Sequence, residues 1–295
     1  MRLDDEPESK NVEDYRDRTG GPSLGGLNGI NLLGLLGQGK GGLILLIIIV
    51  VGAFLGFDLT PMLNGQMPVR QGSSQPRVVS TEETELKSFS LKVLSTTERI
   101  WSAYFKRLGR TYQPPRLRLY RDSTSTACGY GRSASGPFYC PADDRIYLDL
   151  SFYDDMKKQL KASGDFAFAY VIAHEVGHHV QNQLGTSAKA QQAQRSSSKT
   201  EANRISVAVE LQADCYAGVW AHYVQRENRL DSGDVEEAFR AAEAVGDDRL
   251  QEQAGGQVVP DSFTHGSSAQ RLAWFRRGLQ SGNPQQCDTF SQKNL

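Results

Sequence analysis

The chain has 295 residues, a formal net charge of −1 and 39% hydrophobic residues. This balance lacks the basic excess of a nucleic-acid-binding protein, so we expect no nucleic-acid partner. The length is sufficient for one sizeable domain with additional segments.

The first 42 residues are polar and rich in glycine, with 7 acidic against 5 basic residues. A segment of this composition cannot bury enough apolar surface to form a core. Residues 1–42 are therefore predicted to be a flexible tail, disordered or loosely helical.

An unbroken apolar run occupies residues 43–57. It predicts a transmembrane helix over residues 43–59, which is short for a bilayer but feasible if Lys40 snorkels. The core of a signal peptide would lie nearer the terminus, and a buried soluble helix would contain polar interruptions. We therefore expect a single-pass protein of the cell membrane. Basic residues flank the run on both sides, so charge does not decide its orientation.

Residues 60–80 are rich in Pro, Gly and Ser and predict a linker, and residues 81–295 have the pattern of a globular domain. Periodicity in this domain predicts helices at 84–108, 151–161, 234–245 and 267–278, a polar loop or weak helix at 186–198, and strands at 116–120, 138–140 and 145–150. The last helix begins with Ser267 and Gln270, a pair typical of a capping box.

The most informative motif is His174-Glu175-Val176-Gly177-His178. Two imidazoles four residues apart lie on one face of a helix with a carboxylate beside them, which is how a zinc ion and a general base are mounted together in hydrolases. An apolar run at 166–173 leads into the motif, so the helix is expected to be buried. The glycine suggests that another element packs closely there. The alternative is a buried helix whose histidines only satisfy polar neighbours.

The third metal ligand has to come from elsewhere, because Gln181 and Leu184 do not fit metzincin spacing. The remaining candidates are Glu210, His222 and His265. Glu210 and Asp214 lie one turn apart in an apolar helix, where carboxylates need a cation or a donor. We expect Glu210 to bind zinc and Asp214 to accept a hydrogen bond from a ligand histidine. The alternative is a salt bridge of these carboxylates to Arg204 or another cation. His179 and His222 are expected to have no role at the metal.

Chemistry at such a site needs a base and a donor for the developing oxyanion. Glu175 is the expected general base. His265, in a loop just before the last helix, is the best oxyanion donor candidate, and its alternative is an ordinary loop histidine. Arg271 either supports this loop or binds a carboxylate, and a structural role is expected first.

The four cysteines are Cys128, Cys140, Cys215 and Cys287. Cys128 and Cys140 bracket a turn-rich loop that a disulfide could close, although four cysteines allow three pairings. An even number fits an oxidising compartment. The alternative is four free thiols, with Cys215 in the core. We expect residues 58–295 to be extracytoplasmic, in the periplasm or on the outer cell face.

A small antiparallel sheet followed by an HExxH helix and further helices is an α+β arrangement, typical of a zincin-like metallopeptidase domain behind an N-terminal transmembrane helix. An edge strand in such a domain can hold an extended substrate beside the metal. Ile146–Leu150 is the candidate for this strand, and the alternative is that it lies in the interior of the sheet.

Four stretches of the chain resemble the bacterial membrane-anchored "putative neutral zinc metallopeptidase" family: Asn11–Asp14 with the following Gly-rich run, His174–Gln181, Ser206–Cys215 and Phe263–Arg271. The resemblance covers essentially the whole chain. It implies a gluzincin-like zinc peptidase with one Zn²⁺ per chain, in which His174, His178 and Glu210 are the ligands and Glu175 is the base.

Three functions follow as hypotheses. The first is a membrane-tethered peptidase, an endopeptidase by preference, acting on peptide or protein substrates. The second is a catalytically silent, zinc-stabilised scaffold of the cell envelope. An intact Glu175 argues against it, because a structural zinc site needs no base. The third is an exopeptidase or amidase, but the sequence contains no recognisable pocket for a free terminus.

Overall fold

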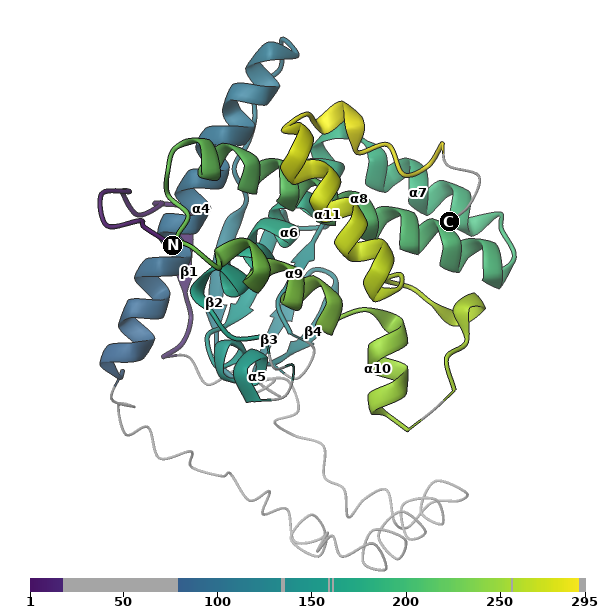
Figure 1. The fold of residues 1–295 in the computed structure, drawn as a ribbon, viewed down its shortest axis with the longest axis horizontal. Helices are drawn as coiled ribbons and strands as arrows, with labels where there is room; N and C mark the ends of the chain where they lie inside the picture. The colour runs from purple at the N-terminus through teal and green to yellow at the C-terminus, as the bar shows by residue number, and fades with distance from the viewer. Residues whose placement is uncertain (18–78, 134–135, 159, 161, 256, 292–295) are drawn as a thin grey trace, which may run out of the picture. The chain divides into compact units, whose positions relative to one another are not determined.

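The computed structural model describes residues 1–17, 79–133, 136–158, 160, 162–255 and 257–291, which belong to one compact unit (Figure 1). The predicted transmembrane helix at 43–59 and nearly all of the predicted linker lie outside these residues. Among the helices that are described, none combines the length and the apolar character needed to cross a membrane.

The main sheet has four strands in the order β1-β2-β6-β5. Their bounds are β1 Val12–Asp14, β2 Arg116–Tyr120, β6 Arg145–Asp149 and β5 Phe138–Cys140. A separate hairpin pairs β3 (Ser123–Thr126) with β4 (Gly129–Arg132). Both β1 and β6 run parallel to β2, and only β5 is antiparallel to its neighbour. The sheet is therefore mixed, and the expectation of an antiparallel sheet was wrong.

Strand β5 lies at one edge of the sheet. The prediction that Ile146–Leu150 forms the edge strand that could hold a substrate was therefore wrong. Strand β6 pairs with β2 on one side and with β5 on the other. Its residues Ile146, Tyr147 and Leu148 are all buried. A strand covered on both faces lacks the alternation of an exposed strand, so its pattern cannot show which strand lies at the edge.

Residues 1–17 differ from the expectation of a flexible tail over 1–42. Val12, Glu13 and Asp14 pair with Leu117, Arg118 and Leu119 as the outer strand of the sheet. Leu3 is buried in the hydrophobic core. A charged segment can be part of a fold without much apolar surface if its carboxylates pair with cations. Here Glu13 pairs with Arg118 and Arg145.

Eight α-helices are present in the described part of the chain, mostly after the sheet, so the fold is α+β. The first is α4, and α5 to α10 follow the sheet in chain order before α11. Their bounds are α4 Thr81–Arg107, α5 Phe152–Lys158, α6 Asp165–Leu184, α7 Thr186–Arg195, α8 Lys199–Arg226, α9 Asp234–Ala244, α10 Asp247–Gln253 and α11 Ser268–Ser281. The predicted capping box is confirmed, because Ser267 and Gln270 bond reciprocally at the start of α11.

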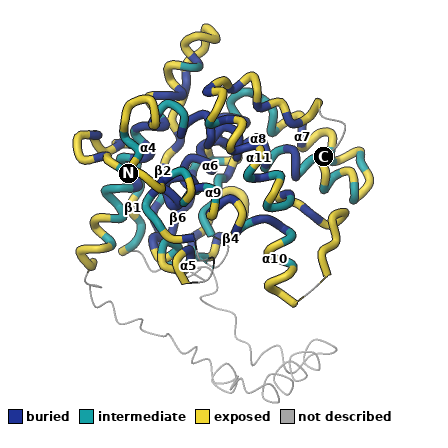
Figure 2. The backbone as a smooth tube through the Cα atoms, in the orientation of Figure 1, coloured by how far each residue is buried: buried dark blue, intermediate teal, exposed yellow. Residues whose placement is uncertain are grey.

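The centre of the molecule is α6, which is buried along most of its length (Figure 2). It crosses α8 at Gly177, where a Cβ atom would lie 3.0 Å from the carbonyl oxygen of Ala213. The close packing expected at this glycine is therefore confirmed. Because Ala213 lies between Glu210 and Asp214 in α8, the crossing brings both carboxylates opposite the HExxH motif.

Helix α11 packs against the C-terminal half of α8, where Gly218 of α8 and Gly278 of α11 face each other. A Cβ on Gly218 would overlap the carbonyl oxygen of Phe275. Two disulfides are present: Cys128–Cys140, the pair favoured from sequence, and Cys215–Cys287, which joins α8 to the C-terminal segment within the core.

Candidate metal centre

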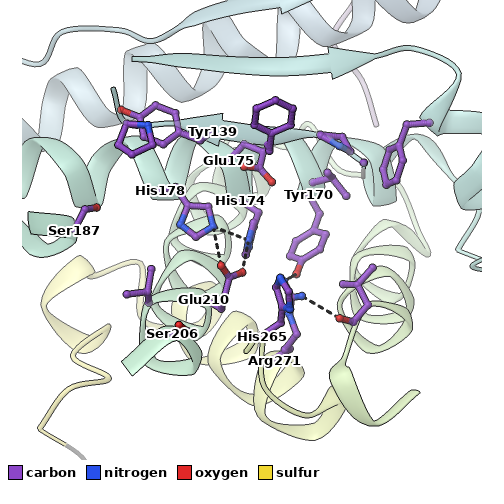
Figure 3. A pocket seen from close by; sticks show the side chains of 18 of the residues that line it. Tyr139, Tyr170, His174, Glu175, His178, Ser187, Ser206, Glu210, His265 and Arg271 are labelled. Atoms are coloured by element: carbon purple, nitrogen blue, oxygen red, sulfur yellow. Dashed lines mark hydrogen bonds and ion pairs between the residues drawn. The ribbon is translucent and has the colours of Figure 1, made fainter. Parts of the chain in front are cut away.

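Helices α6 and α8 bring three donor groups together at one point (Figure 3). His174 Nε2 lies 3.2 Å from Glu210 Oε2, and His178 Nε2 lies 3.5 Å from Glu210 Oε1. The two imidazole Nε2 atoms are 3.1 Å apart. Among the described residues this His/His/Glu group is one of two clusters whose donors could converge on an ion, and it is the one beside Glu175.

The separations fit a zinc ion. Ligand atoms about 2.1 Å from a tetrahedral zinc lie about 3.4 Å from one another. The three observed distances fall on either side of this value. Three protein ligands rather than four also leave one position open, as in catalytic zinc sites.

His174 is oriented by a fully buried carboxylate. Its Nδ1–H donates to Asp214 Oδ1 at 2.9 Å, which leaves Nε2 free to bind a metal. Asp214 also accepts from the Tyr170 hydroxyl at 2.6 Å and from two nitrogens of Arg271 at 2.9 Å each. Every one of these side chains is buried. Arg271 thus binds the carboxylate, one of the two roles considered from sequence.

His178 has a different support, which sequence reasoning missed. Its Nδ1–H donates to Gln181 Oε1 at 2.9 Å. The orientation of this amide is set by its other end, where Gln181 Nε2 donates to the carbonyl of Val209 at 2.7 Å. The same glutamine that excluded metzincin spacing therefore fixes the second ligand. Its position one turn after His178 was the available signal.

The buried charges favour a cation at this point. Burial alone would lower the pKa of His174, but Asp214 and Glu210 raise it to about 10. Burial would likewise raise the pKa of Glu210, but the two histidines hold it well below its usual value. Positive charge is thus stabilised between the ligands, and a metal ion can supply it in place of protons.

Glu175 is buried, and burial raises the pKa of its carboxyl group. The carboxylate accepts a hydrogen bond from the backbone N–H of Tyr139 in the edge strand β5. In Figure 3 its carboxyl group points into the cavity beside the ligand histidines. A carboxyl group with a raised pKa can exchange a proton nearer neutral pH, as a general base must.

His265 lies at the rim of the same cavity, with its side chain 51% exposed. Asp247, which sequence reasoning also missed, holds this loop. Its Oδ2 accepts from the backbone N–H groups of Thr264, His265 and Gly266 at 2.6 to 3.0 Å. Its Oδ1 lies 3.3 Å from His265 Nδ1, and this hydrogen bond raises the pKa of His265.

The cavity has a volume of about 920 Å³ and is bounded by β5, α6, α8 and the His265 loop. Figure 3 places Ser187 and Ser206 on its His178 side, and Tyr170 on the other. Apolar side chains also line it, namely Phe138, Phe152, Leu160, Val171, Val245 and Leu250. The volume lies near the upper end of the range for ligand-binding clefts, about 300–1,000 Å³.

The other residues considered from sequence lie away from the donors. His222 donates to the carbonyl of Leu279, and the buried His179 contacts the carbonyl of Gln113. Arg204 pairs with Glu201 and Asp261 rather than with Glu210 or Asp214. The other form of that alternative, a salt bridge to another cation, is observed for Asp214, which pairs with Arg271.

The fold and the site define an α+β protein with an HExxH motif and a His/His/Glu donor set on two crossed helices. The model of one family, described as "Putative neutral zinc metallopeptidase", matches residues 1–290. The chain belongs to this family.

Three relatives from different bacteria are similar to this chain. The chain is 55% identical to "Uncharacterized protein YpfJ" of Escherichia coli K12 over 292 residues, which is 99% of each chain. It is 43% identical over 215 residues to "Uncharacterized protein Mb2605" of Mycobacterium bovis and "Uncharacterized protein Rv2575" of Mycobacterium tuberculosis, covering 69% of this chain and 71% of each relative. No solved structure matches the chain.

Proposed function

We propose that the protein is a zinc-dependent peptidase, and that His174, His178 and Glu210 hold one Zn²⁺. The observation that carries the proposal is the convergence of these donors while each Nδ1–H is bonded elsewhere, so both Nε2 atoms are available. A zinc ion at this place supplies a Lewis acid and lowers the pKa of a bound water towards about 7.

The side chains around the donors have distinct tasks. Glu175 accepts the proton of the attacking water and later returns it to the leaving amine. His265, held by Asp247, donates to the oxygen that becomes negatively charged. An extended peptide can pair with β5, whose outer edge has no strand partner among the described residues.

The cavity also separates this proposal from its alternatives. A silent scaffold requires neither Glu175 nor a cavity of about 920 Å³ at the donors. A carboxypeptidase needs a cationic side chain that binds the free carboxyl terminus of its substrate. Arg271, the arginine that lines the cavity, is already paired with Asp214. We therefore favour an endopeptidase over a carboxypeptidase.

Location follows as part of the proposal. Two disulfides are typical of proteins that fold in an oxidising compartment, so we place the peptidase domain outside the cytoplasm. Attachment to the membrane through residues 43–59 stays a prediction from sequence.

The test uses the full-length protein, purified in detergent, and an unstructured protein as substrate. We expect zinc-dependent cuts, mapped by mass spectrometry, that a chelator abolishes and added zinc restores. Glu175→Gln should retain one zinc per chain and lose at least 100-fold in rate, because a positioned base contributes about that much. A wild-type protein that binds zinc but cuts nothing would favour the scaffold. A variant with more than about a tenth of the activity would exclude Glu175 as the base.

A further inference from the structure

The N-terminal segment 9–16 contains a motif that the proposed reaction does not use, Asn11-Val12-Glu13-Asp14. It is built into the same folded unit as the residues after position 79. The backbone of Leu117 donates to the carbonyl of Asn11, and the backbone of Tyr15 donates to the carbonyl of Leu119, both at 2.8 Å. These bonds continue the β1–β2 ladder in both directions.

Charge pairs hold the strand in register. Glu13 lies among three arginines, at 3.2 Å from Arg116, 2.5 Å from Arg118 and 3.1 Å from Arg145. These arginines come from β2 and β6, so the carboxylate joins three strands. Burial would raise the pKa of Glu13, but hydrogen bonds from Arg145 and Arg118 outweigh it and lower the pKa to about 2.

The residues before the strand are anchored as well, in this case to helices. Ser9 and Asn11 both donate to Glu98 of α4, at 2.6 and 2.9 Å. Further upstream, Asp5 pairs with Arg229 at 2.7 Å. The N-terminal residues therefore contact β2, β6, α4 and the loop after α8 at once. An interface of this kind forms only if both parts share one compartment.

This arrangement constrains the path of the chain. A segment that crosses a membrane once places its two flanks on opposite sides, whereas strand pairing places residues 9–16 and 116–120 at hydrogen-bond distance. We propose that residues 1–17 and 79–291 lie on the same side of the membrane, so that the intervening chain makes an even number of crossings, none or two. A single crossing, as predicted from the apolar run, would separate the two parts of the chain, so the two topologies exclude each other and thiol labelling distinguishes them.

The sequence permits such a path. The 61 residues from 18 to 78 exceed the roughly 34 to 50 that two helical crossings require. Residues 19–39 and 41–57 contain no charged side chain, and Lys40 separates them. The first of these stretches is richer in Gly and Asn and therefore less apolar, which is why the second alone attracts attention in a hydropathy pattern.

The test is thiol labelling in native membranes, and it does not depend on peptidase activity. All four native cysteines are in disulfides, so an introduced cysteine is the sole free thiol. Lys10→Cys reports on the N-terminal segment, and Ser102→Cys on an exposed position of α4. A membrane-impermeant maleimide is applied to intact spheroplasts and to lysed ones, and labelling after denaturation gives the total.

We expect both thiols to have the same accessibility: both react before lysis if this side faces outward, and both only after lysis if it faces inward. One thiol that reacts before lysis and one that reacts only after it would overturn the proposal. As a second measurement, Glu8→Cys and Ser88→Cys, whose parent side chains are 2.6 Å apart, should be joined by a short bismaleimide in membranes. Chains with one of the two cysteines serve as controls, and failure of the doubly substituted chain to cross-link would count against the docked strand.

Discussion

The two sides of the candidate site are built on opposite principles. Beneath the donors, Asp214 is fully buried and bonded to His174, Tyr170 and Arg271. At the rim, His265 is about half exposed and depends on a single carboxylate, Asp247. Buried charges that are fully paired are rigid and costly to disturb, whereas an exposed donor can move and be exchanged with little effect on folding. The lower side should therefore govern metal binding and stability, and the rim should govern rate.

The largest effect is expected from Glu210→Ala, which removes the ligand that α8 contributes beside the two histidines of α6. The variant should lose nearly all zinc on dialysis, measured by atomic absorption. His222→Ala removes a histidine of α8 that bonds to the carbonyl of Leu279, away from the three ligands, and it should retain the metal. Equal zinc content in the two variants would mean that the third ligand is another residue.

The next effect is expected from Asp214→Ala, which leaves the Arg271 guanidinium buried and unpaired. Breaking a buried pair in this way typically costs about 3–5 kcal/mol in the free energy of unfolding. The melting temperature and the zinc affinity should fall together, because His174 also loses its orienting acceptor. Glu201→Ala breaks the exposed pair with Arg204 and should cost no more than about 1 kcal/mol. Similar melting temperatures for both variants would refute the claim that the buried pair on the lower side governs stability.

At the rim, His265→Ala should lower turnover by about 100- to 1,000-fold, because an oxyanion donor acts mainly in the transition state. Zinc content, melting temperature and the Michaelis constant should stay close to those of the parent, since the side chain is half exposed. Loss of zinc would instead make His265 a ligand and reopen the assignment of Glu210. Unchanged turnover would make it an ordinary loop residue.

Whether a site residue could be predicted from sequence depended on how close its partners lie along the chain. His174, Glu175 and His178 lie within one helical turn, and Glu210 and Asp214 within another, so local spacing was enough to single out each set. Their connection was predicted from the need for a third ligand, from the cost of buried carboxylates and from the family resemblance. Asp247 and Glu13 act on residues that are distant in sequence, and only the packed structure shows their partners.

The errors in the fold have a similar origin. Strand β1 has three residues, too few for an alternating pattern, and its stability comes from arginines on β2 and β6. The order of β5 and β6 in the sheet was equally hidden, because burial on both faces removes the polar alternation that distinguishes an edge.

The smallest effect is expected from Asp247→Asn, which preserves the shape of the side chain that holds the loop but removes its charge. Asp247 raises the pKa of His265, so the protonated imidazole persists to higher pH in the parent than it would alone. If the protonated form is the donor, activity is lost as the pH rises through this pKa. The basic limb of the turnover profile should therefore move to lower pH in the variant, with about a tenfold loss at the optimum, the lower end of what orienting groups contribute.

Asp248→Asn is the matched control. This neighbouring carboxylate accepts hydrogen bonds from the backbone N–H and the hydroxyl of Ser268, the first residue of α11, rather than from the His265 loop. The basic limb of the pH profile of turnover for Asp248→Asn should coincide with that of the parent. A limb that moves equally in both variants would indicate a general effect on the α10–α11 region. A limb that moves in neither would show that His265 does not act as the protonated donor, even if His265→Ala had lowered the rate.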